Sequence, residues 1–466
     1  MTTVDQKEFE KHLSRELAVF IVNARYEHLD NKTIQQTRFA LLDALGVSIA
    51  ATTLGEGVNT FIEWVREENA QGPCKVFARE LTTSPSLAAF ANGALAHALD
   101  FEDAHDKALV HPNAAVVPAV LAVGQSLPSV SGQELLTAIA VGCDVTCRLG
   151  FAVAGTLDQF SWYPPPILSA YGATAAASKL LGLNEGQILD AFSLTMSQAT
   201  CSAEIKHNPQ SQVRAIRDAF PAQAGVVSAQ LALKGLTGFN QPLEGKDGFF
   251  AGFARGDFAV NALRQGLGQE FAIKELSFKP WPSCRGTHAP IELMLNLCKK
   301  YSLKSSDIES ITVYSNTLNR MLAEPLASKR APTTAIDAKF SIPFCIACVV
   351  TNGEVNLNSF FPDSLNNKDI LSLAERVNYR VDFNFSSPLM ARVEVKLGDG
   401  RTLESQADSA LGCPERPLSE QQLIDKFLHC LSHSADKNQI VNATEFADSV
   451  LNIDKADKLP SLFQFL

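Results

Sequence analysis

The sequence lacks several features that mark whole classes of protein. Its 466 residues contain no run of about 18 uninterrupted apolar residues, the length that a membrane helix needs. The N-terminal segment MTTVDQKEFEKHLSREL is charged and contains no apolar signal core. Charged residues make up only 19%, and the net charge of -10 argues against nucleic acid as the main partner. We therefore expect a cytoplasmic protein with no membrane or nucleic-acid partner, although a local cationic pocket would still suit a small anion.

Motifs for common cofactors and metals are also missing. We find no GxGxxG, P-loop, HExxH or GxSxG sequence in the context that each requires. The ten cysteines include the pairs Cys143/Cys147 and Cys345/Cys348, but neither pair has a second pair or histidines at zinc spacing. Both pairs lie in apolar runs, which indicates buried, reduced thiols on helices. The sequence therefore predicts no metal and no organic cofactor.

Apolar residues recur at helical spacing from the N-terminus to about residue 265. Hydrophobic residues make up 46% of the chain, which is enough for a sizeable core. Strand patterns are almost absent from this part. The expected helices cover residues 33–51, 87–100, 113–125, 134–149, 170–181, 185–198 and 222–234.

The pattern changes after about residue 270. Residues 311–316 alternate like a strand, and residues 391–397 and 401–406 flank a GDG turn and predict a β-hairpin. Helices are expected at residues 289–299 and 338–350, and a capping sequence at Ser419 begins a last helical stretch. We predict a mainly α fold: a large all-helical domain, residues 1–270 and 406–466, with an inserted smaller α+β lid domain, residues 271–405. Such an insertion places a cleft between two bodies, a common location for an active site.

The densest polar cluster is ALDFEDAHDKALVHP, residues 98–112, between two apolar segments. It includes Asp100, His105 and His111. Imidazoles beside carboxylates are oriented and made more basic, as general acid or base catalysis requires. A solvated loop is the simpler interpretation. A divalent-ion site is a third, although the spacing matches no standard ligand set.

A second segment, FKPWPSCRGTHA at residues 278–289, combines Lys279, Arg285 and His288 at the expected start of a helix. Positive charge at a helix N-terminus suits a carboxylate. The alternative is a surface hinge between domains.

Two further segments contain one arginine pair and one phenol. Arg214 and Arg217 are spaced i, i+3, so they share one face of a helix and could each bind a carboxylate, unless that face is simply solvated. Tyr163 lies between Trp162 and three prolines, which could hold the phenol fixed or form an ordinary packed turn.

These segments, in this order, resemble the MmgE/PrpD family, which includes 2-methylcitrate dehydratase, cis-aconitate decarboxylase and iminodisuccinate epimerase. The similar stretches run over nearly the whole chain: LLDALGVSIAA, ANGALAHALDFEDAH with HPNAAVVPAVLA, YGATAAASKLLGL, LALKGLTGF with LEGKDGFF, KPWPSCRGTHAPIE and AIDAKFSIPF. The resemblance implies a helical domain with an α+β lid, a homodimer, and a small polycarboxylate substrate.

Some residues match the family pattern and others depart from it. Asp100 and His111 match the family's loop acid and histidine, and Lys279 and His288 match the lysine and histidine of its K-x-x-P motif, whereas Ala104 stands where several members have Thr. The remaining positions depart from the pattern. Tyr163, a phenol, stands where His is usual, and the cations Arg214 and Arg217 stand where Lys and His are usual. Arginine cannot lend a proton near neutral pH, because its pKa is above about 12.

These departures favour epimerisation among the family's reactions. Inverting a carbon next to a carboxylate needs two bases and cations to hold the carboxylates, but no acid for a leaving group. The predicted proton-transfer residues are Tyr163, His111, Lys279 and Asp100, and the predicted substrate-binding residues are His105, Arg214, Arg217, Arg285 and His288. Iminodisuccinate is the expected substrate. Two alternatives stay open: a dehydratase or decarboxylase of a tricarboxylate such as 2-methylcitrate or cis-aconitate, and a non-catalytic polycarboxylate-binding protein.

Overall fold

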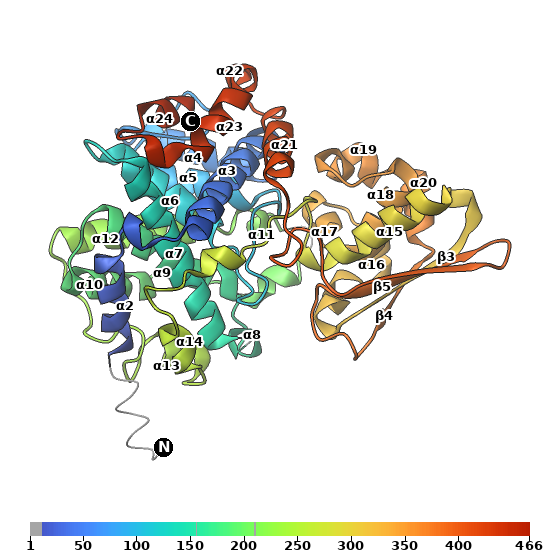
Figure 1. Ribbon diagram of the computed structural model, residues 1–466, viewed down its shortest axis with the longest axis horizontal. Coiled ribbons are helices and arrows are strands. Elements are labelled where there is room, and N and C mark those ends of the chain that lie inside the picture. Colours follow the sequence, from blue (N-terminus) through green and yellow to red (C-terminus); the bar gives the residue numbers. More distant parts are fainter. Residues whose placement is uncertain (1–11, 155, 209–210) are drawn as a thin grey trace, which may run out of the picture.

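The computed structural model describes residues 12–154, 156–208 and 211–466. Figure 1 shows two bodies joined side by side: a larger helical one that contains both ends of the chain, and a smaller one with a sheet. The predicted mainly α fold is confirmed. The helices of the larger body are α2 Leu13–Asn23, α3 Asn31–Leu54, α4 Val58–Glu67, α5 Pro85–His97, α6 Asn113–Ser126, α7 Gly132–Val153, α8 Thr156–Gln159, α9 Pro164–Leu180, α10 Glu185–Met196, α11 Val213–Ile216, α12 Ala219–Leu233, α13 Phe249–Ala254, α14 Val260–Arg264, α21 Glu420–Leu431, α22 Lys437–Val441, α23 Ala443–Leu451 and α24 Pro460–Phe465.

Long apolar helices form the centre of the larger body. α3 and α7 are long and apolar enough to cross a membrane, but 83% and 94% of their most apolar windows are buried inside the protein, as in core helices. Small residues let these helices pack closely. A Cβ atom added at Gly172 of α9 would lie 1.8 Å from Thr146 Oγ1 of α7. The predicted buried thiols Cys143 and Cys147 lie on α7, and both are free.

The smaller body packs helices on a four-stranded sheet. Its strands, β3 Ile308–Ser315, β4 Val377–Val381, β5 Ala391–Leu397 and β6 Thr402–Ala407, lie in the order β4-β3-β5-β6. The β5–β6 pair is the predicted hairpin, whereas β4, which pairs parallel to β3, was not predicted. The main helices and turns of this body are α15 His288–Tyr301, η6 Thr317–Leu322, α16 Leu326–Arg330, α17 Ala335–Lys339, α18 Ile342–Asn352, α19 Pro362–Leu365 and α20 Lys368–Ala374.

The helix expected over residues 338–350 is divided in two. α17 ends at Lys339, and the Ser341 side chain caps α18 by accepting a hydrogen bond from the Phe344 N–H (3.0 Å). Pro343 lies in the first turn of α18, where a missing N–H costs nothing. The break turns the chain between the two bodies and brings Lys339 and Phe340 toward the larger one.

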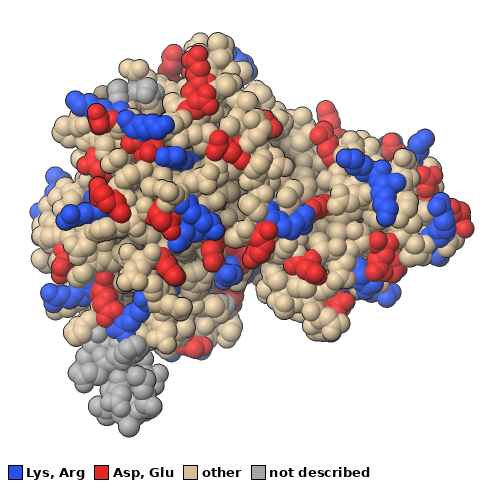
Figure 2. Space-filling model, in the orientation of Figure 1, with Lys and Arg blue, Asp and Glu red and all other residues tan. Residues whose placement is uncertain are grey.

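Each body has its own hydrophobic core. The larger core contains residues from Leu13 to Phe278, then Leu357, and then residues from Leu418 onward. The segment from Phe271 to Phe278 therefore packs with the larger body, although the sequence assigned that segment to the inserted domain. The smaller core extends from Ala289 to Cys413. The two segments that connect the larger body to the smaller one lie side by side, because the Phe278 N–H donates to the Gly412 carbonyl at 3.0 Å. Figure 2 shows an indented surface where the bodies meet, with acidic and basic side chains interspersed over the visible face.

Candidate active site

A cavity of about 230 Å³ lies between the two bodies. Six of the nine predicted site residues line it: Asp100, His105, His111, Tyr163, Arg214 and Arg285. The larger body supplies residues from the 100–111 loop and the start of α9, and the smaller body supplies η6, Phe340, and the turn at Pro388 and Leu389. Lys279, Arg217 and His288 are buried beside the cavity, not on its surface. The fold therefore brings all four chemically interesting segments together.

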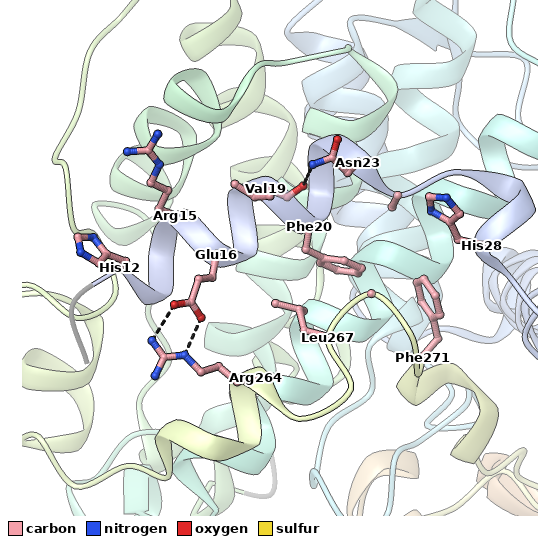
Figure 3. Close-up of a pocket in the computed structure, with 12 residues that line it drawn as sticks. His12, Arg15, Glu16, Val19, Phe20, Asn23, His28, Arg264, Leu267 and Phe271 are labelled. Atoms are coloured by element: carbon pink, nitrogen blue, oxygen red, sulfur yellow. Dashed lines mark hydrogen bonds and ion pairs between the residues drawn. The ribbon is translucent and has the colours of Figure 1, made fainter. Parts of the chain in front are cut away.

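Larger surface pockets exist, but they do not gather these groups. The pocket of about 670 Å³ in Figure 3 lies between α2 and the segment that contains Leu267 and Phe271. Two of its charged side chains pair with each other, since Arg264 donates to Glu16 through two hydrogen bonds of 2.6 and 2.7 Å. None of the predicted site residues lines it. The smaller cavity is therefore the better candidate for chemistry.

Lys279 and Asp100 form a buried ion pair at the base of the cavity. The Lys279 ammonium group donates to Asp100 Oδ1 at 2.8 Å and to the Asp100 carbonyl at 2.9 Å. Asp100 has a φ of 49°, in the left-handed region. Burial alone would raise the pKa of Asp100, but the ammonium group of Lys279 holds it below its usual value. Asp100 is therefore ionised and Lys279 protonated.

Two more buried lysines hold the same turn. The Lys339 ammonium group donates to the Leu99 carbonyl at 2.6 Å, and that of Lys426 donates to the Phe101 carbonyl at 2.7 Å. With Lys279, the carbonyls of residues 99, 100 and 101 each accept a hydrogen bond from a different lysine. These lysines come from α17, the crossing segment and α21, so three distant parts of the chain fix the turn that carries the site acid.

Glu102 orients His111 toward the cavity. Its buried Oε1 lies 2.9 Å from His111 Nδ1 and 2.6 Å from His97 Nδ1, and the Asp103 carbonyl lies 3.0 Å from His111 Nδ1. Burial would raise the pKa of Glu102, but the neighbouring His97, Lys279 and His111 hold it well below its usual range. An ionised Glu102 places the His111 proton on Nδ1, which leaves Nε2 as a hydrogen-bond acceptor.

Tyr163 is held by Arg217. The prolines that follow Tyr163 begin α9, and the Tyr163 N–H donates to the Cys201 carbonyl at 2.9 Å. Arg217 Nη1 donates to the phenol oxygen at 3.0 Å, and Arg217 Nε lies 3.2 Å from Asp218 Oδ2. Burial opposes the charge of Arg217, but Tyr163 and Asp218 raise its pKa, so the guanidinium stays charged.

A continuous chain of polar contacts joins Tyr163 to His111. From Arg217 it passes to Asp218, whose Oδ2 lies 3.8 Å from His97 Nδ1, and His97 contacts the same Glu102 oxygen as His111. The two groups suited to proton transfer therefore share one buried network. Glu102 lies within the polar cluster at residues 98–112 and His97 lies just before it, but neither was given a role from the sequence. The contact of Glu102 with His97 is local, so only its geometry was missing from the sequence pattern.

The cations along the cavity differ in how they are paired. Arg285 forms contacts of 3.2 Å with both carboxylate oxygens of Asp106, and Lys206 pairs with Asp158 at 2.5 Å. The guanidinium of Arg214 stacks on the Phe340 ring at 3.5 Å, and its buried Nε has no hydrogen-bond partner among residues 12–154, 156–208 and 211–466. Among the lysines and arginines of the described residues that line this cavity, Arg214 is the one without a carboxylate partner. It is the natural receptor for a substrate carboxylate.

His288 and His105 are engaged within the protein. His288 Nδ1 lies 3.1 Å from Arg285 Nη1 and its Nε2 lies 3.0 Å from the Ser283 carbonyl, so the ring positions Arg285. Burial and Arg285 hold the pKa of His288 well below its usual range. His105 Nδ1 accepts the Ala108 N–H at 3.2 Å, and burial lowers its pKa to about 4. Both rings are therefore neutral at neutral pH.

Comparisons with known proteins agree with this architecture. The family model of the MmgE/PrpD N-terminal domain matches residues 15–261, and that of the C-terminal domain matches residues 281–449. The chain belongs to the MmgE/PrpD family. Cis-aconitate decarboxylase of Homo sapiens is 26% identical over 430 residues, which cover 90% of this chain and 87% of that protein. A cis-aconitate decarboxylase-like protein of Aspergillus oryzae is 23% identical over 498 residues, which cover 100% and 99%. Cis-aconitate decarboxylase of Mus musculus is 26% identical over 440 residues, which cover 90% and 86%.

One group of side chains in this MmgE/PrpD member has the composition of a metal site. Oxygen and nitrogen atoms of His97, Asp100 and Glu102 lie within 4.8 Å of one another. The Lys279 ammonium group already lies among them, 2.8 Å from Asp100 Oδ1 and 3.7 Å from Glu102 Oε1. Glu102 Oε1 also faces two imidazole Nδ1 atoms. A protonated lysine therefore already supplies positive charge to the two carboxylates of this group.

Proposed function

We propose that this MmgE/PrpD protein is a cofactor-free enzyme that moves a proton at a carbon next to a carboxylate in a small polycarboxylate. The observation that carries the proposal is the composition of the cavity. Within the described part of the chain, His111 Nε2 has no hydrogen-bond partner, Tyr163 presents a phenol bound to a permanent cation, and Arg214 has no carboxylate partner. A base, an acid and a carboxylate receptor on one cavity are the parts that such a reaction needs.

Each group has a distinct role in the proposed reaction. Arg214 binds a substrate carboxylate and stabilises the charge that enters it when the neighbouring carbon loses a proton. His111 Nε2 accepts that proton. The Tyr163 hydroxyl returns a proton to the other face of the carbon, and Arg217 at 3.0 Å stabilises the phenolate that remains. In the reverse direction the two groups exchange roles. Lys279, Asp100 and Glu102 keep the loop and the His111 tautomer in place.

The proposed reaction class is epimerisation, because inversion needs two proton-transfer groups and no acid for a leaving group, and His111 and Tyr163 both line the cavity. Iminodisuccinate carries four carboxylates, whereas Arg214 is the cavity's one cation without a carboxylate partner among the described residues. Arg285 would have to release Asp106, and Lys206 would have to release Asp158, to hold further carboxylates. A substrate with two or three carboxylates therefore suits this cavity better than iminodisuccinate.

A lyase is the second candidate, and the relatives favour it. The human and mouse proteins are named cis-aconitate decarboxylases, and each covers 90% of this chain. In a decarboxylase, Tyr163 or His111 would protonate the carbon that loses carbon dioxide. The identities of 26% are compatible with a different reaction on the same framework, since a fold supports several chemistries.

Substrates in heavy water separate these candidates. The protein, after exhaustive EDTA treatment and desalting, is incubated with iminodisuccinate, 2-methylcitrate, cis-aconitate and simpler dicarboxylates, and followed by NMR. Inversion with deuterium incorporation identifies an epimerase, and loss of water or carbon dioxide identifies a lyase. Binding with no reaction would identify a non-catalytic binding protein and refute the proposal. Activity that returns only with a divalent ion would refute its cofactor-free part.

A homodimer and a cytoplasmic location also belong to this proposal. Both rest on the family resemblance and on the composition of the chain. Sedimentation velocity of the purified protein tests the first, with a species of twice the chain mass expected. Fractionation of cells that express the native gene tests the second.

A further inference from the structure

One of the ten cysteines lines the cavity between the two bodies. Cys201, Cys284 and Cys298 are partly exposed, whereas the other seven cysteines are buried, and all ten are free. Cys284 lies on the cavity wall, and neither Cys201 nor Cys298 is among the described residues that line it. A cysteine sulfur is intrinsically a strong nucleophile. The cavity therefore contains a nucleophile that the proposed proton transfers do not use.

Backbone hydrogen bonds hold Cys284 in place. Its N–H donates to the Lys339 carbonyl at 3.0 Å, and its carbonyl accepts a hydrogen bond from the Thr287 N–H at 2.9 Å. Lys339 is followed by Phe340, the ring on which the Arg214 guanidinium stacks at 3.5 Å. Cys284, Phe340 and Arg214 all line the cavity. The thiol and the guanidinium therefore lie in the same part of its wall.

Charged and polar groups surround the Cys284 thiol. Burial and the Asp100 carboxylate raise its pKa, whereas the Gly286 N–H, Lys279 and Arg214 act in the opposite direction. Lys279 is paired with Asp100, but Arg214 is buried and its Nε has no hydrogen-bond partner among the described residues. A reagent whose carboxylate binds Arg214 is therefore held beside the thiol, at a high effective concentration.

We infer that Cys284 is a covalent modification site for electrophilic carboxylates, which Arg214 directs to the thiol. This inference rests on the proposed function for the role of Arg214 as the carboxylate receptor. With an α,β-unsaturated dicarboxylate, the sulfur forms a bond to the β-carbon as the electron pair of the C=C bond moves to the α-carbon. The proton lost by the thiol is returned to that α-carbon. The resulting thioether occupies the cavity, so such compounds inactivate the protein.

Two alkylating reagents that differ in charge test the inference. The wild type is treated with iodoacetate or with neutral iodoacetamide, and the alkylation rate of each cysteine is followed by peptide mass spectrometry. In both reactions the sulfur bonds to carbon and iodide leaves. The ratio of the iodoacetate rate to the iodoacetamide rate should be at least about tenfold higher at Cys284 than at Cys201 and Cys298. These two are internal controls, because burial raises their pKa values to about 11.

Variants separate the receptor from the nucleophile. Arg214→Gln should lower the ratio at Cys284 to that of the two control cysteines. Lys206→Gln is the matched control, because Lys206 also lines the cavity but is paired with Asp158, and it should leave the ratio unchanged. Maleate should add its own mass at Cys284 in the wild type and not in Cys284→Ser. Circular dichroism checks folding, and protection of wild-type Cys284 by succinate tests the receptor without a substitution.

The outcomes distinguish this inference from the proposed function. A ratio at Cys284 equal to that at the control cysteines would overturn the inference, and turnover of a carboxylate in heavy water would leave the proposed function standing. A raised ratio that persists in folded Arg214→Gln, or that succinate does not reduce, would also overturn it. A raised ratio that depends on Arg214, with no reaction of any substrate, would refute the proposed function alone.

Discussion

The ammonium group of Lys279 lies 2.8 Å from the carboxylate of Asp100, and neither side chain is accessible to solvent by more than 1%. The pair joins the segment that crosses between the two bodies to the loop that carries the site histidine. Because Lys279 also donates to the Asp100 carbonyl, it fixes both the side chain and the left-handed backbone of the acid. The geometry of the cavity therefore depends on a buried charge pair.

Replacing Lys279 by Met should abolish turnover and also destabilise the protein. Loss of the ammonium group leaves the buried carboxylates of Asp100 and Glu102 without a cation, which costs about 3–5 kcal/mol. Urea unfolding measures the loss, and Lys279→Met/Asp100→Asn should recover part of it. Lys396→Met, which breaks an exposed ion pair with Glu309, should change stability by less than about 1 kcal/mol.

The Lys339→Met variant should respond to alkaline pH differently from the wild type. Burial lowers the pKa of Lys339 to about 8, from 10.5 when it is exposed. Between these values the unfolded chain binds a proton that the native protein does not, so this lysine adds stability as the pH rises. The advantage of the wild type over Lys339→Met should grow by up to about 3 kcal/mol from pH 8 to 10.5. Urea unfolding at pH 8 and at pH 10 measures the free energy of unfolding of both proteins. If the difference between them is the same at both pH values, the pKa of Lys339 is not lowered in the folded protein.

His105 should make the protein sensitive to acid. Burial lowers its pKa from 6.5 to about 4, so between these values only the unfolded state binds the proton and stability falls as the pH falls. His105→Asn keeps an acceptor for the Ala108 N–H. In this variant the free energy of unfolding should fall by up to about 3 kcal/mol less than in the wild type as the pH decreases from 6.5 to 4. Thermal unfolding at pH 7 and pH 4.5 tests it. The exposed His429→Asn variant is the control and should follow the wild type.

Arg214 and Arg217 should give different kinetic defects, although the sequence treated them as an equivalent pair. Arg214→Lys removes a bidentate contact to substrate and should raise KM about 10- to 100-fold, which corresponds to about 1–3 kcal/mol. Arg217→Lys disturbs the phenol of Tyr163 and should act mainly on kcat. Steady-state kinetics separate the two effects. The exposed Arg401→Lys variant should leave both constants unchanged, and an unchanged KM in Arg214→Lys would exclude it as the carboxylate receptor.

Local patterns predicted the fold better than long-range pairings did. The β5–β6 hairpin follows from alternating residues on either side of a GDG turn, which are signals within one short segment. β4 was missed because its sequence, VNYRV, has polar residues at its centre and its parallel partner lies far away in the chain. The four-residue α11 is shorter than the helix that the spacing of Arg214 and Arg217 suggested.

The same distinction applies to the site. Residues 98–112 and 278–289 were recognised by their composition, and the structure brings both to one cavity. The partners of these residues could not be read in the same way. No pattern in the neighbouring sequence indicates that Asp106 forms an ion pair with Arg285. The same is true of the hydrogen bonds that Lys339 and Lys426 donate to the carbonyls of residues 99 and 101. Such contacts depend on where the second body and the C-terminal helices pack.

The most direct measurement is proton exchange by Tyr163→Phe, since the central claim is that His111 and Tyr163 serve opposite faces of one carbon. Each antipode of the substrate is incubated in deuterium oxide with wild type, Tyr163→Phe and His111→Gln, and exchange and inversion are followed by NMR. The phenylalanine keeps the ring and removes only the hydroxyl. Tyr163→Phe should lose inversion while one antipode still exchanges its proton through His111, and His111→Gln should show the converse. Inversion at the normal rate by Tyr163→Phe, or loss of both activities through one residue alone, would contradict the two-base account.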